Sequence, residues 1–332
     1  MIKTEITEMF GVTYPIICGA MMWLCTPPLC AAISNAGGLG NLTAGNYETE
    51  DEFRNAINET RKLTDNPFMV NITILPSLRI TPAHHKMYVK VCAEERVAGI
   101  EVSGTPLDRG VGMEAIETLK KAGVRLFHKL GSVRHALHAE KVGYDGIYAA
   151  GFEEGGHPLK DNVPTMLLTP RIVDSVKIPV VTTGGIADGR SLAAALTLGA
   201  QGVMMASRFV VTKECQVHEN IKKELLKRQE FDTTLFGRSM GLQGRGLLNQ
   251  ALREVIAIEE RGGGLQELIP LMAGDRIKRA WETGDIEYAP LMVGQSIGLI
   301  NDIPTCKELL DRMGREAGEI LHKTNTMFSG LQ

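Results

Sequence analysis

Short apolar runs alternate with amphipathic stretches along the first two-thirds of the chain. Eight of these runs have the length and the β-branched content of buried strands, and they cover residues 15–20, 39–45, 68–74, 99–104, 125–130, 146–151, 179–185 and 202–209. The stretches between them have helical spacing, and several end on Gly, as helices often do. Strict alternation of strand and helix indicates a parallel sheet. Eight such units favour an α/β fold of the (β/α)8 TIM-barrel type over an open doubly wound sheet.

The pattern changes after the eighth run. A long polar region with helical spacing occupies residues 216–290, and an apolar segment then leads to a last amphipathic helix that starts at Cys306. We therefore expect three parts. They are a barrel over residues 1–212, a smaller inserted helical domain or lid over residues 213–290, and a return to the barrel over residues 291–332.

Composition and charge argue against several classes of function. The chain has 332 residues, of which 44% are hydrophobic and 23% charged, and its formal net charge is -3. This balance provides no basic field for a nucleic acid or an anionic membrane surface, so a small-molecule substrate is favoured. The chain has no run of about 18 apolar residues, and its N-terminus is mixed and acidic. These features predict no membrane span, no signal peptide and a cytoplasmic location, and they leave open whether the protein forms a homodimer.

Metal and nucleophile chemistry find little support in the sequence. The six cysteines show no C-x-x-C spacing, so reduced thiols are expected rather than disulfides or a zinc knuckle. Histidines at positions 84, 85, 135 and 138 lack a matched set of cysteines or carboxylates, and no metal site is predicted. The segment Gly237–Gly241 fits the G-x-S-x-G pattern of a nucleophile elbow. It follows no strand, however, and has no partner acid or histidine beside it.

Polar and glycine residues concentrate at the carboxyl ends of the strand-like runs, where barrel enzymes carry their active sites. Gly184 and Gly185 close the seventh run, and Ala206 and Ser207 lie in the eighth. Backbone N–H groups at this place in barrels often bind phosphate. A tight turn alone would also explain the glycine pair, but the two clusters together favour a phosphate site.

Polar or flexible side chains end three other runs. Lys129 ends the fifth run, so its ammonium group should point into the barrel mouth and requires a counter-charge there. The negative charge of a reduced flavin would supply one, whereas a lysine that reaches the surface is the alternative. Asn71 both donates and accepts hydrogen bonds, which suits the pyrimidine edge of a flavin or the closing of a turn. The segment Met21–Trp23 suits either the core or a flavin-facing position.

The loop that leaves the sixth run is the most distinctive segment of the chain. It reads Gly-Phe-Glu-Glu-Gly-Gly-His-Pro from Gly151 to Pro158. Its glycines would let the backbone lie against a flat ring, and His157 offers a base or a donor whose ordinary pKa is near neutrality. Glu153 and Glu154 either orient the histidine or face solvent.

These residues together resemble the nitronate monooxygenase family, which also contains NADH:quinone reductases and flavin-type enoyl-ACP reductases. The similarity extends from the segment FGVTYPIICGAM near the N-terminus to the segment MVGQS near residue 296. The resemblance implies an FMN-binding barrel with a smaller helical domain over the flavin. It also implies flavin contacts from Ala20, Met21, Met22, Asn71, Lys129, Ala150, Gly151, Gly155 and Gln295, and phosphate contacts from Gly184, Gly185, Met205, Ala206 and Ser207.

The resemblance also bears on the reaction. The motif Glu-Ala-Gly-Gly-His-Arg-Gly of nitronate enzymes places their catalytic base at His157. Here Pro158 follows the histidine, and Ala150 stands where those enzymes often carry Gln. Segments such as FHKLGSVRHALHAEKVGYDGI are more similar to the NADH:quinone reductase branch. The resemblance therefore implies an enzyme that uses NADH or NADPH to reduce a quinone-like acceptor. In it Lys129 would stabilise the reduced flavin, and His157 would donate to the acceptor oxygen.

Three other functions stay open. The same fold and cofactor suit a nitronate monooxygenase that oxidises alkyl nitronates with O2, or an enoyl-thioester reductase, which would need a groove for a long acyl carrier. A non-catalytic flavin-binding scaffold is an alternative of another class, although it would need neither Lys129 nor His157. No G-x-G-x-x-G of a Rossmann fold follows a strand, so a nicotinamide cofactor would bind in the cleft above the flavin.

Overall fold

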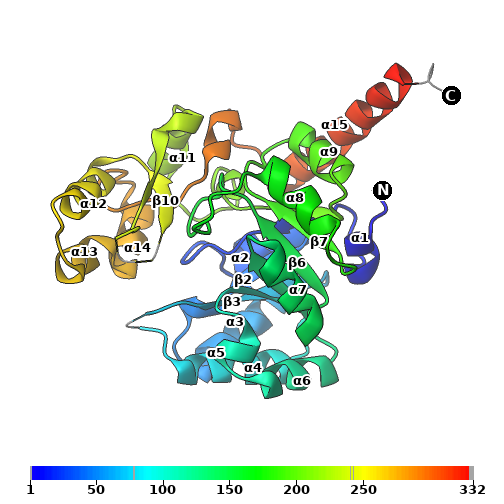
Figure 1. Cartoon of the computed structure of the whole chain (residues 1–332), viewed down its shortest axis with the longest axis horizontal. Helices are drawn as coiled ribbons and strands as arrows, with labels where there is room; N and C mark the ends of the chain where they lie inside the picture. Colours follow the sequence, from blue (N-terminus) through cyan, green and yellow to red (C-terminus); the bar gives the residue numbers. More distant parts are fainter. Residues whose placement is uncertain (1, 78, 240, 242, 329–332) are drawn as a thin grey trace.

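The computed structural model describes residues 2–77, 79–239, 241 and 243–328. At its centre is a sheet of eight parallel strands in the order β1-β8-β7-β6-β5-β4-β3-β2. The strands are β1 Ile16–Cys18, β2 Gly40–Thr43, β3 Phe68–Ile74, β4 Gly99–Gly104, β5 Arg125–Leu130, β6 Gly146–Ala150, β7 Val180–Thr183 and β8 Gly202–Met205. A bridge between Ile17 and Leu39 joins the two edges, so the sheet forms a nearly closed barrel. The predicted (β/α)8 barrel is confirmed, and each of the eight apolar runs contains one strand (Figure 1).

Helices surround the barrel on its outside (Figure 1). They include α2 Pro27–Asn35, α3 Glu50–Leu63, α4 Pro82–Glu94, α6 Met113–Lys121, α7 Val133–Val142, α8 Thr165–Val173, α9 Gly189–Thr197, the short α10 Ser207–Val210 and the long α15 Cys306–Met327. A capping box formed by Thr305 and Glu308 starts α15. This helix packs against α9 and α2 and completes the ring of helices. Among the described residues, no helix is both long and apolar enough to span a membrane.

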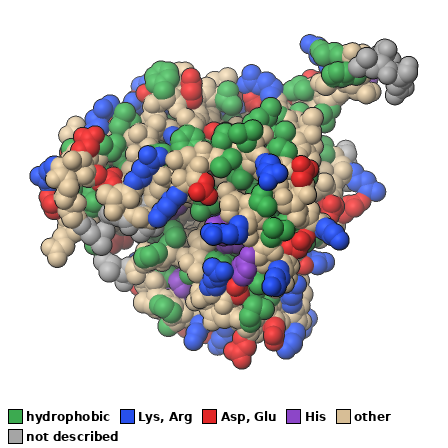
Figure 2. All heavy atoms as spheres, viewed as in Figure 1, with side chains coloured by type: hydrophobic (Ala, Val, Ile, Leu, Met, Phe, Trp, Pro, Cys, Tyr) green, Lys and Arg blue, Asp and Glu red, His purple; other side chains and the backbone are tan. Residues whose placement is uncertain are grey.

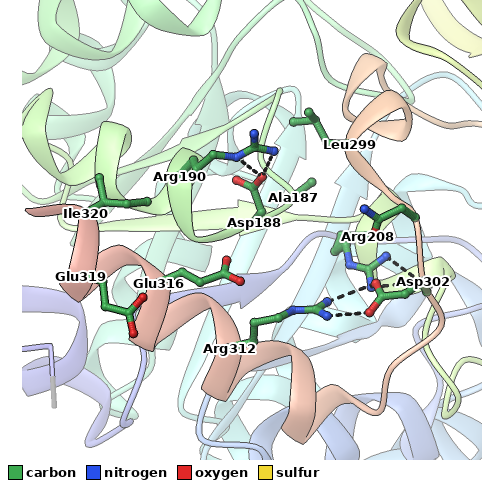
Figure 3. Close-up of a pocket in the computed structure, with 11 residues that line it drawn as sticks. Ala187, Asp188, Arg190, Arg208, Leu299, Asp302, Arg312, Glu316, Glu319 and Ile320 are labelled. Carbon is green, nitrogen blue, oxygen red and sulfur yellow. Dashed lines mark hydrogen bonds and ion pairs between the residues drawn. The ribbon is translucent and has the colours of Figure 1, made fainter.

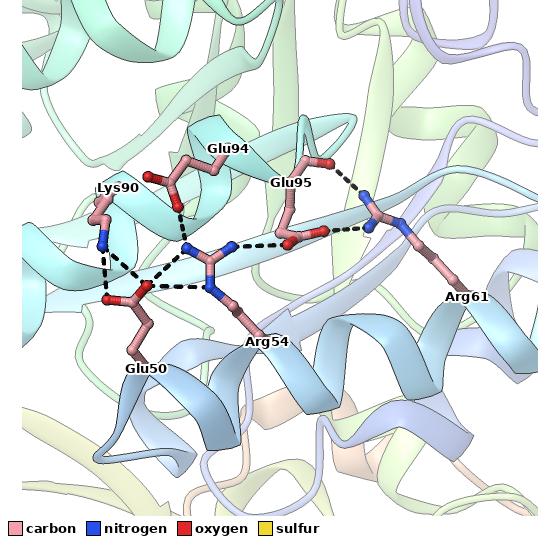
Figure 4. A network of polar contacts seen from close by, with 6 residues as sticks. All are labelled: Glu50, Arg54, Arg61, Lys90, Glu94 and Glu95. Carbon is pink, nitrogen blue, oxygen red and sulfur yellow. Dashed lines mark hydrogen bonds and ion pairs between the residues drawn. The ribbon is translucent and has the colours of Figure 1, made fainter.

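A network of ion pairs joins α3 to α4 on the outer surface (Figure 4). Arg54 of α3 is its centre, because it contacts Glu50 at 2.7 Å, Glu95 at 2.9 Å and also Glu94. Arg61 adds a second contact to Glu95 at 2.6 Å. Ion pairs at a surface contribute little individually, so this network supports the packing of the two helices without dominating stability.

The barrel interior has an apolar layer below a polar one. The apolar layer consists of side chains that are at most 2% exposed, namely Ile17, Met69, Phe127, Tyr148, Val181 and Met204. Ile6 and Phe10 of α1 (Glu5–Phe10) pack against this layer and close the amino end of the barrel. Toward the carboxyl ends of the strands the buried side chains become polar. The apolar core therefore closes the amino end of the barrel. The polar side chains lie at the carboxyl end, which we call the mouth.

The segment between β8 and α15 contains more than the helices that its polar pattern predicts. It holds α11 Glu219–Leu225, α12 Gln250–Glu260, α13 Leu265–Met272, α14 Gly274–Thr283 and the short helix η3 Gln295–Leu299. It also holds an antiparallel hairpin of β9 (Thr233–Phe236) and β10 (Gly244–Leu247), which the sequence pattern does not predict. The sequence of β10, Gly-Arg-Gly-Leu, lacks a clear strand pattern. Its first glycine is required by packing, because a Cβ there would lie 2.4 Å from the Phe236 ring.

Candidate active site

Glu101 of β4 is the centre of a buried polar network at the mouth. Its carboxylate accepts hydrogen bonds from the Asn41 amide (2.5 Å) and the Ser103 hydroxyl (2.7 Å). Its backbone oxygen accepts one from the Asn71 amide (3.4 Å), and Asn71 accepts in turn from the Thr73 hydroxyl (3.0 Å). Burial raises the pKa of Glu101, although a neighbouring ammonium group and these donors oppose it. Asn71, a predicted flavin contact, has no exposed surface.

Lys129 of β5 lies beside this network and pairs with Glu154 of the loop between β6 and α8. The Lys129 Nζ is 3.2 Å from Oε2 and 3.5 Å from Oε1 of Glu154, and the two side chains are 19% and 7% exposed. Burial alone would lower the pKa of Lys129, but Glu154 and Glu101 outweigh it and hold that pKa above its ordinary value. Burial also raises the pKa of Glu154, against the attraction of Lys129. The mouth thus holds an ammonium group between two buried carboxyl groups.

His157 lies in the same loop, and its imidazole contacts the insert. Its Nδ1 is 3.1 Å from the backbone oxygen of Gln243. Because a carbonyl oxygen only accepts, this contact assigns the proton to Nδ1 and leaves a free lone pair on Nε2 of the neutral ring. His157 is exposed to solvent, although many protein atoms lie near its ring. Desolvation of the ring by these atoms lowers the pKa of His157. The hydrogen bond with Gln243 raises this pKa, and the positive charge of Lys129 lowers it further. His157 is therefore a neutral base within electrostatic reach of Lys129.

β10 of the insert holds the His157 loop through backbone and side-chain contacts. Gly156 and Arg245 exchange two backbone hydrogen bonds of 3.0 and 2.7 Å in an antiparallel bridge. The Arg245 guanidinium, 2% exposed, donates to the Phe152 oxygen (3.3 Å) and to the Thr233 hydroxyl (3.1 Å). It also lies 4.5 Å from the centre of the Phe152 ring. The position of the histidine therefore depends on the hairpin.

α14 contacts the mouth at a second place, through Trp23. The Trp23 indole donates to the backbone oxygen of Gly274 (2.9 Å), and its backbone N–H donates to the Asn46 side chain (2.8 Å). Arg79 and Lys278 lie over its ring at 4.7 and 5.1 Å. Trp23 has a φ of 69°, which is unfavourable for a bulky residue and is maintained by these contacts. The insert thus holds the loops after β6 and after β1.

Gly184 and Gly185, after β7, present free backbone donors. Their φ values of 98° and 76° favour glycine at both positions. Within the described residues, neither N–H has an acceptor. A Cβ on Gly185 would have no atom closer than 3.9 Å, so this residue faces open space, whereas a Cβ on Gly184 would lie 3.0 Å from the oxygen of Gly151. Free N–H groups beside open space suit an anionic ligand such as a phosphate.

The return segment after the insert meets the end of β8 and the His157 loop. The Ser207 hydroxyl accepts a hydrogen bond from the Gly294 N–H (2.9 Å), and the Gln295 N–H donates to the Glu153 oxygen (2.9 Å). Gly155 packs on the same segment, because a Cβ on it would lie 2.5 Å from a backbone carbon of the return segment. Ser207, Gln295 and the His157 loop are therefore joined by direct contacts.

The other residues predicted to contact FMN also lie at the carboxyl ends of the strands, and they differ in exposure to solvent. Half-buried or exposed positions are Ala20, Met21, Met22 and Ala206. Buried positions are Ala150, Gly151 and Met205. The Met205 side chain belongs to the core, so only its backbone is suited to a ligand contact. The structure brings the predicted residues to one end of the barrel, and their contacts with a ligand stay predictions.

A cavity of about 400 Å³ lies outside the mouth, between α9, α15 and the segment that follows η3 (Figure 3). Arg208 and Arg312 both pair with Asp302, at 2.8 and 2.6 Å, and Arg190 pairs with Asp188. Figure 3 shows these pairs along the cavity wall. Because these arginines already form ion pairs with carboxylates, their charges are neutralised within the protein. We therefore do not assign a ligand to this cavity.

Several residues of the mouth carry no recognisable motif. Glu101 and Asn41 lie within strands, where only their polarity among apolar neighbours distinguishes them. Gln243 and Arg245 lie in or beside the hairpin, and the contact of Glu154 with Lys129 depends on the fold. Among the residues that the structure describes, no group of three or more His, Cys, Asp or Glu side chains is arranged to hold a metal ion.

Known proteins are similar to this chain in both sequence and fold. A sequence profile described as nitronate monooxygenase matches residues 3–316. The chain is 33% identical to (3aS,4S,5R,7aS)-5-hydroxy-7a-methyl-1-oxo-octahydro-1H-indene-4-carboxyl-CoA dehydrogenase from Rhodococcus jostii, over 95% of this chain and 96% of that protein. It is 32% identical to a probable nitronate monooxygenase from Staphylococcus aureus, over 91% and 94%. The structure of FabK from Thermotoga maritima shares 34% identity with a TM-score of 0.90, over 98% of this chain and 100% of that one.

Proposed function

This chain belongs to the nitronate monooxygenase family, a family of oxidoreductases, and from that premise we propose that it is an FMN-dependent enzyme. It takes electrons from NADH or NADPH and passes them to a small electron-poor acceptor. The observation that carries the proposal is the arrangement at the mouth, where Lys129 lies beside Glu154 and His157 presents a free Nε2 from the same loop. A half-buried cation and a base at one opening suit a reaction that moves negative charge and a proton together.

The residues of the mouth fit an FMN group. Gly184 and Gly185 offer to its phosphate N–H groups that have no acceptor among the described residues. Ser207 keeps a hydroxyl proton to donate, because its oxygen accepts from Gly294; Ala206 and the Met205 backbone adjoin it. In this proposal the residues that contact the flavin ring of FMN are Ala20, Met21, Met22, Asn71, Lys129, Ala150, Gly151, Gly155 and Gln295. When bound, FMN supplies the ability to accept electrons from a nicotinamide and to release them to a second substrate.

His157 handles the proton of the second substrate in this proposal. Because Nδ1 is engaged by Gln243, Nε2 accepts a proton when a substrate is oxidised and returns it when an acceptor is reduced. The lowered pKa of His157 favours the neutral, accepting form. This changes the role inferred from the sequence, in which His157 acts as a donor, because donation from Nε2 requires prior protonation of the ring.

A quinone-like compound and an acyl thioester are the two candidates for the second substrate. The quinone follows from the resemblance to the NADH:quinone reductase branch. The thioester is favoured by the Rhodococcus relative, which is named a dehydrogenase of a carboxyl-CoA compound. A neutral base at His157 also suits the removal of the acidic proton beside a thioester carbonyl. The same base could deprotonate a neutral nitroalkane to its nitronate, the substrate that the name of the Staphylococcus relative suggests.

Turnover with defined acceptors tests the proposal. The full chain, supplied with FMN, would be assayed with NADH and with NADPH against a benzoquinone and against crotonyl-CoA. Nicotinamide oxidation that depends on either acceptor supports the proposal, and the faster reaction identifies the acceptor class. Consumption of an alkyl nitronate with O2, without nicotinamide oxidation by any acceptor, would contradict it. A chain that binds FMN but turns over neither acceptor nor nitronate would favour the non-catalytic scaffold, and a chain that binds no FMN would contradict the proposal.

A further inference from the structure

Glu154 gives the mouth a charge balance that Lys129 alone would not have. Its carboxyl group is 7% exposed and lies 3.2 Å from the Lys129 Nζ. The motif Glu-Ala-Gly-Gly-His has Ala at this position and Glu at the preceding one, which is Glu153 here. Glu153 is engaged elsewhere, because it accepts from the N–H (3.0 Å) and the hydroxyl (2.9 Å) of Thr165. Glu154 is therefore an additional acid in direct contact with the half-buried Lys129.

The groups around Lys129 leave Glu154 as its direct partner. Glu101 also attracts Lys129, but its two carboxyl oxygens accept from Asn41 and Ser103. The imidazole of His157 is neutral in the tautomer assigned above, so it adds no charge beside Lys129. The charge that Lys129 presents to a ligand in the mouth is therefore set mainly by Glu154.

We propose that Glu154 tunes the reduction potential of bound FMN by partly neutralising Lys129. The inference rests on the proposed FMN site. Bound FMN gains negative charge when it is reduced, and the Lys129 ammonium stabilises that charge. A carboxylate 3.2 Å from the ammonium offsets this stabilisation, and the effect is large because the pair is shielded from water. Glu154 thereby lowers the potential and makes the reduced enzyme a stronger electron donor.

Removal of the charge on Glu154 should raise the potential. Glu154→Gln keeps the shape of the side chain, and Glu154→Ala introduces the residue of the motif. In both variants we expect reduced FMN to bind at least about tenfold more tightly relative to oxidised FMN, which is a rise of about 30 mV for a two-electron couple. Equilibration of the FMN-loaded full chain with a reference dye measures the shift, after bound FMN has been quantified by its absorption.

The same substitution in a chain without Lys129 tests whether Glu154 changes the reduction potential through Lys129 or only through the structure of the loop. In a Lys129→Met chain the buried Glu154 has lost its cation, so burial favours its protonated, uncharged form. Glu154→Gln should then leave the potential nearly unchanged. Equal shifts in the two backgrounds would overturn a role through Lys129.

Failure of this inference and failure of the proposed function give different results. A parent chain that binds no FMN would overturn the proposed function and the inference together. A parent chain that binds FMN, with both single variants at an equal or lower potential, would overturn the inference alone.

Discussion

The proton of the His157 ring is located by one contact, the 3.1 Å approach of Nδ1 to the backbone oxygen of Gln243. Nε2 is the remaining nitrogen that can exchange a proton with a substrate. His157→Asn removes this proton carrier, and we expect kcat/KM for the acceptor to fall by at least about 100-fold. Steady-state kinetics at matched FMN content measure the loss. A variant as fast as the parent would exclude the role.

His128, which precedes Lys129 on β5, makes stability depend on pH. Its ring is 4% exposed and contacts the Val102 oxygen through Nδ1 at 3.0 Å, and burial lowers its pKa to about 4. The unfolded chain binds this proton near the ordinary value of 6.5. As pH falls, the unfolded state is therefore protonated first. The contribution is present above about pH 6.5 and is lost between there and about pH 4, by on the order of 3 kcal/mol.

A comparison of the parent with His128→Gln isolates this contribution. Urea unfolding at pH 7 and at pH 5 should show a steeper loss of stability in the parent than in the variant, because the variant has no proton to bind at this position. Other titrating groups, among them Glu101, affect both chains alike. Parallel pH profiles would show that His128 does not carry the effect.

Gly185 can be tested against a matched glycine far from the mouth. Its φ of 76° makes Ala unfavourable by about 1 to 2 kcal/mol. Gly123, in an exposed turn after α6, has a φ of 81° and open space around it, so Ala should cost the same there. We expect both variants to lose similar stability, whereas only Gly185→Ala weakens FMN binding. Equal FMN affinity in the two variants, measured by titration, would remove Gly185 from the phosphate site.

At the scale of elements, β10 determines how the His157 loop is held. Arg245→Met removes the hydrogen bonds to Phe152 and Thr233 while keeping an apolar stem beside the Phe152 ring. We expect the Nδ1 contact of His157 to loosen, and its pKa to fall further below the ordinary value, because the Gln243 contact is what opposes the lowering. We also expect kcat/KM to fall while FMN affinity stays unchanged. Imidazole NMR and kinetics measure these effects, and the exposed Arg261→Met serves as the control. Unchanged His157 resonances would contradict the coupling.

The barrel strands are predictable from the sequence, whereas the hairpin is not. β7 and β8 are buried along their whole length, because helices cover one side and the barrel interior the other, and their sequences are short runs of mostly β-branched or apolar residues. β9 and β10 are four residues each, and their conformation is set by pairing with each other and with Gly156. Such pairing is tertiary, so no local pattern predicts it.

At the scale of the whole molecule, the same distinction applies to the site. Lys129, Asn71 and the Gly184–Gly185 pair are predictable because a parallel barrel brings the carboxyl ends of all strands to one rim. The partners of these residues are not predictable. Glu101 and Asn41 are 60 positions apart, and Glu154 and Lys129 are 25 apart, so only the fold brings them together.

One face of the molecule agrees with the preference for a small-molecule substrate. On the face in Figure 2, Lys and Arg side chains are interspersed with Asp and Glu and form no continuous basic stripe. The formal net charge of -3 is consistent with this mixture. The chemistry is therefore expected at the mouth that the insert contacts through β10 and α14, rather than on an extended charged surface.

Anaerobic reduction of bound FMN distinguishes a nicotinamide-dependent reductase from an oxidase of nitronates. The full chain loaded with FMN would be mixed without O2 with NADH, with NADPH and, separately, with an alkyl nitronate, while the visible absorption of the flavin is followed. We expect NADH or NADPH to bleach the absorption, and a quinone or an enoyl thioester then to restore it. Bleaching by the nitronate, with no response to either nicotinamide, would contradict this expectation.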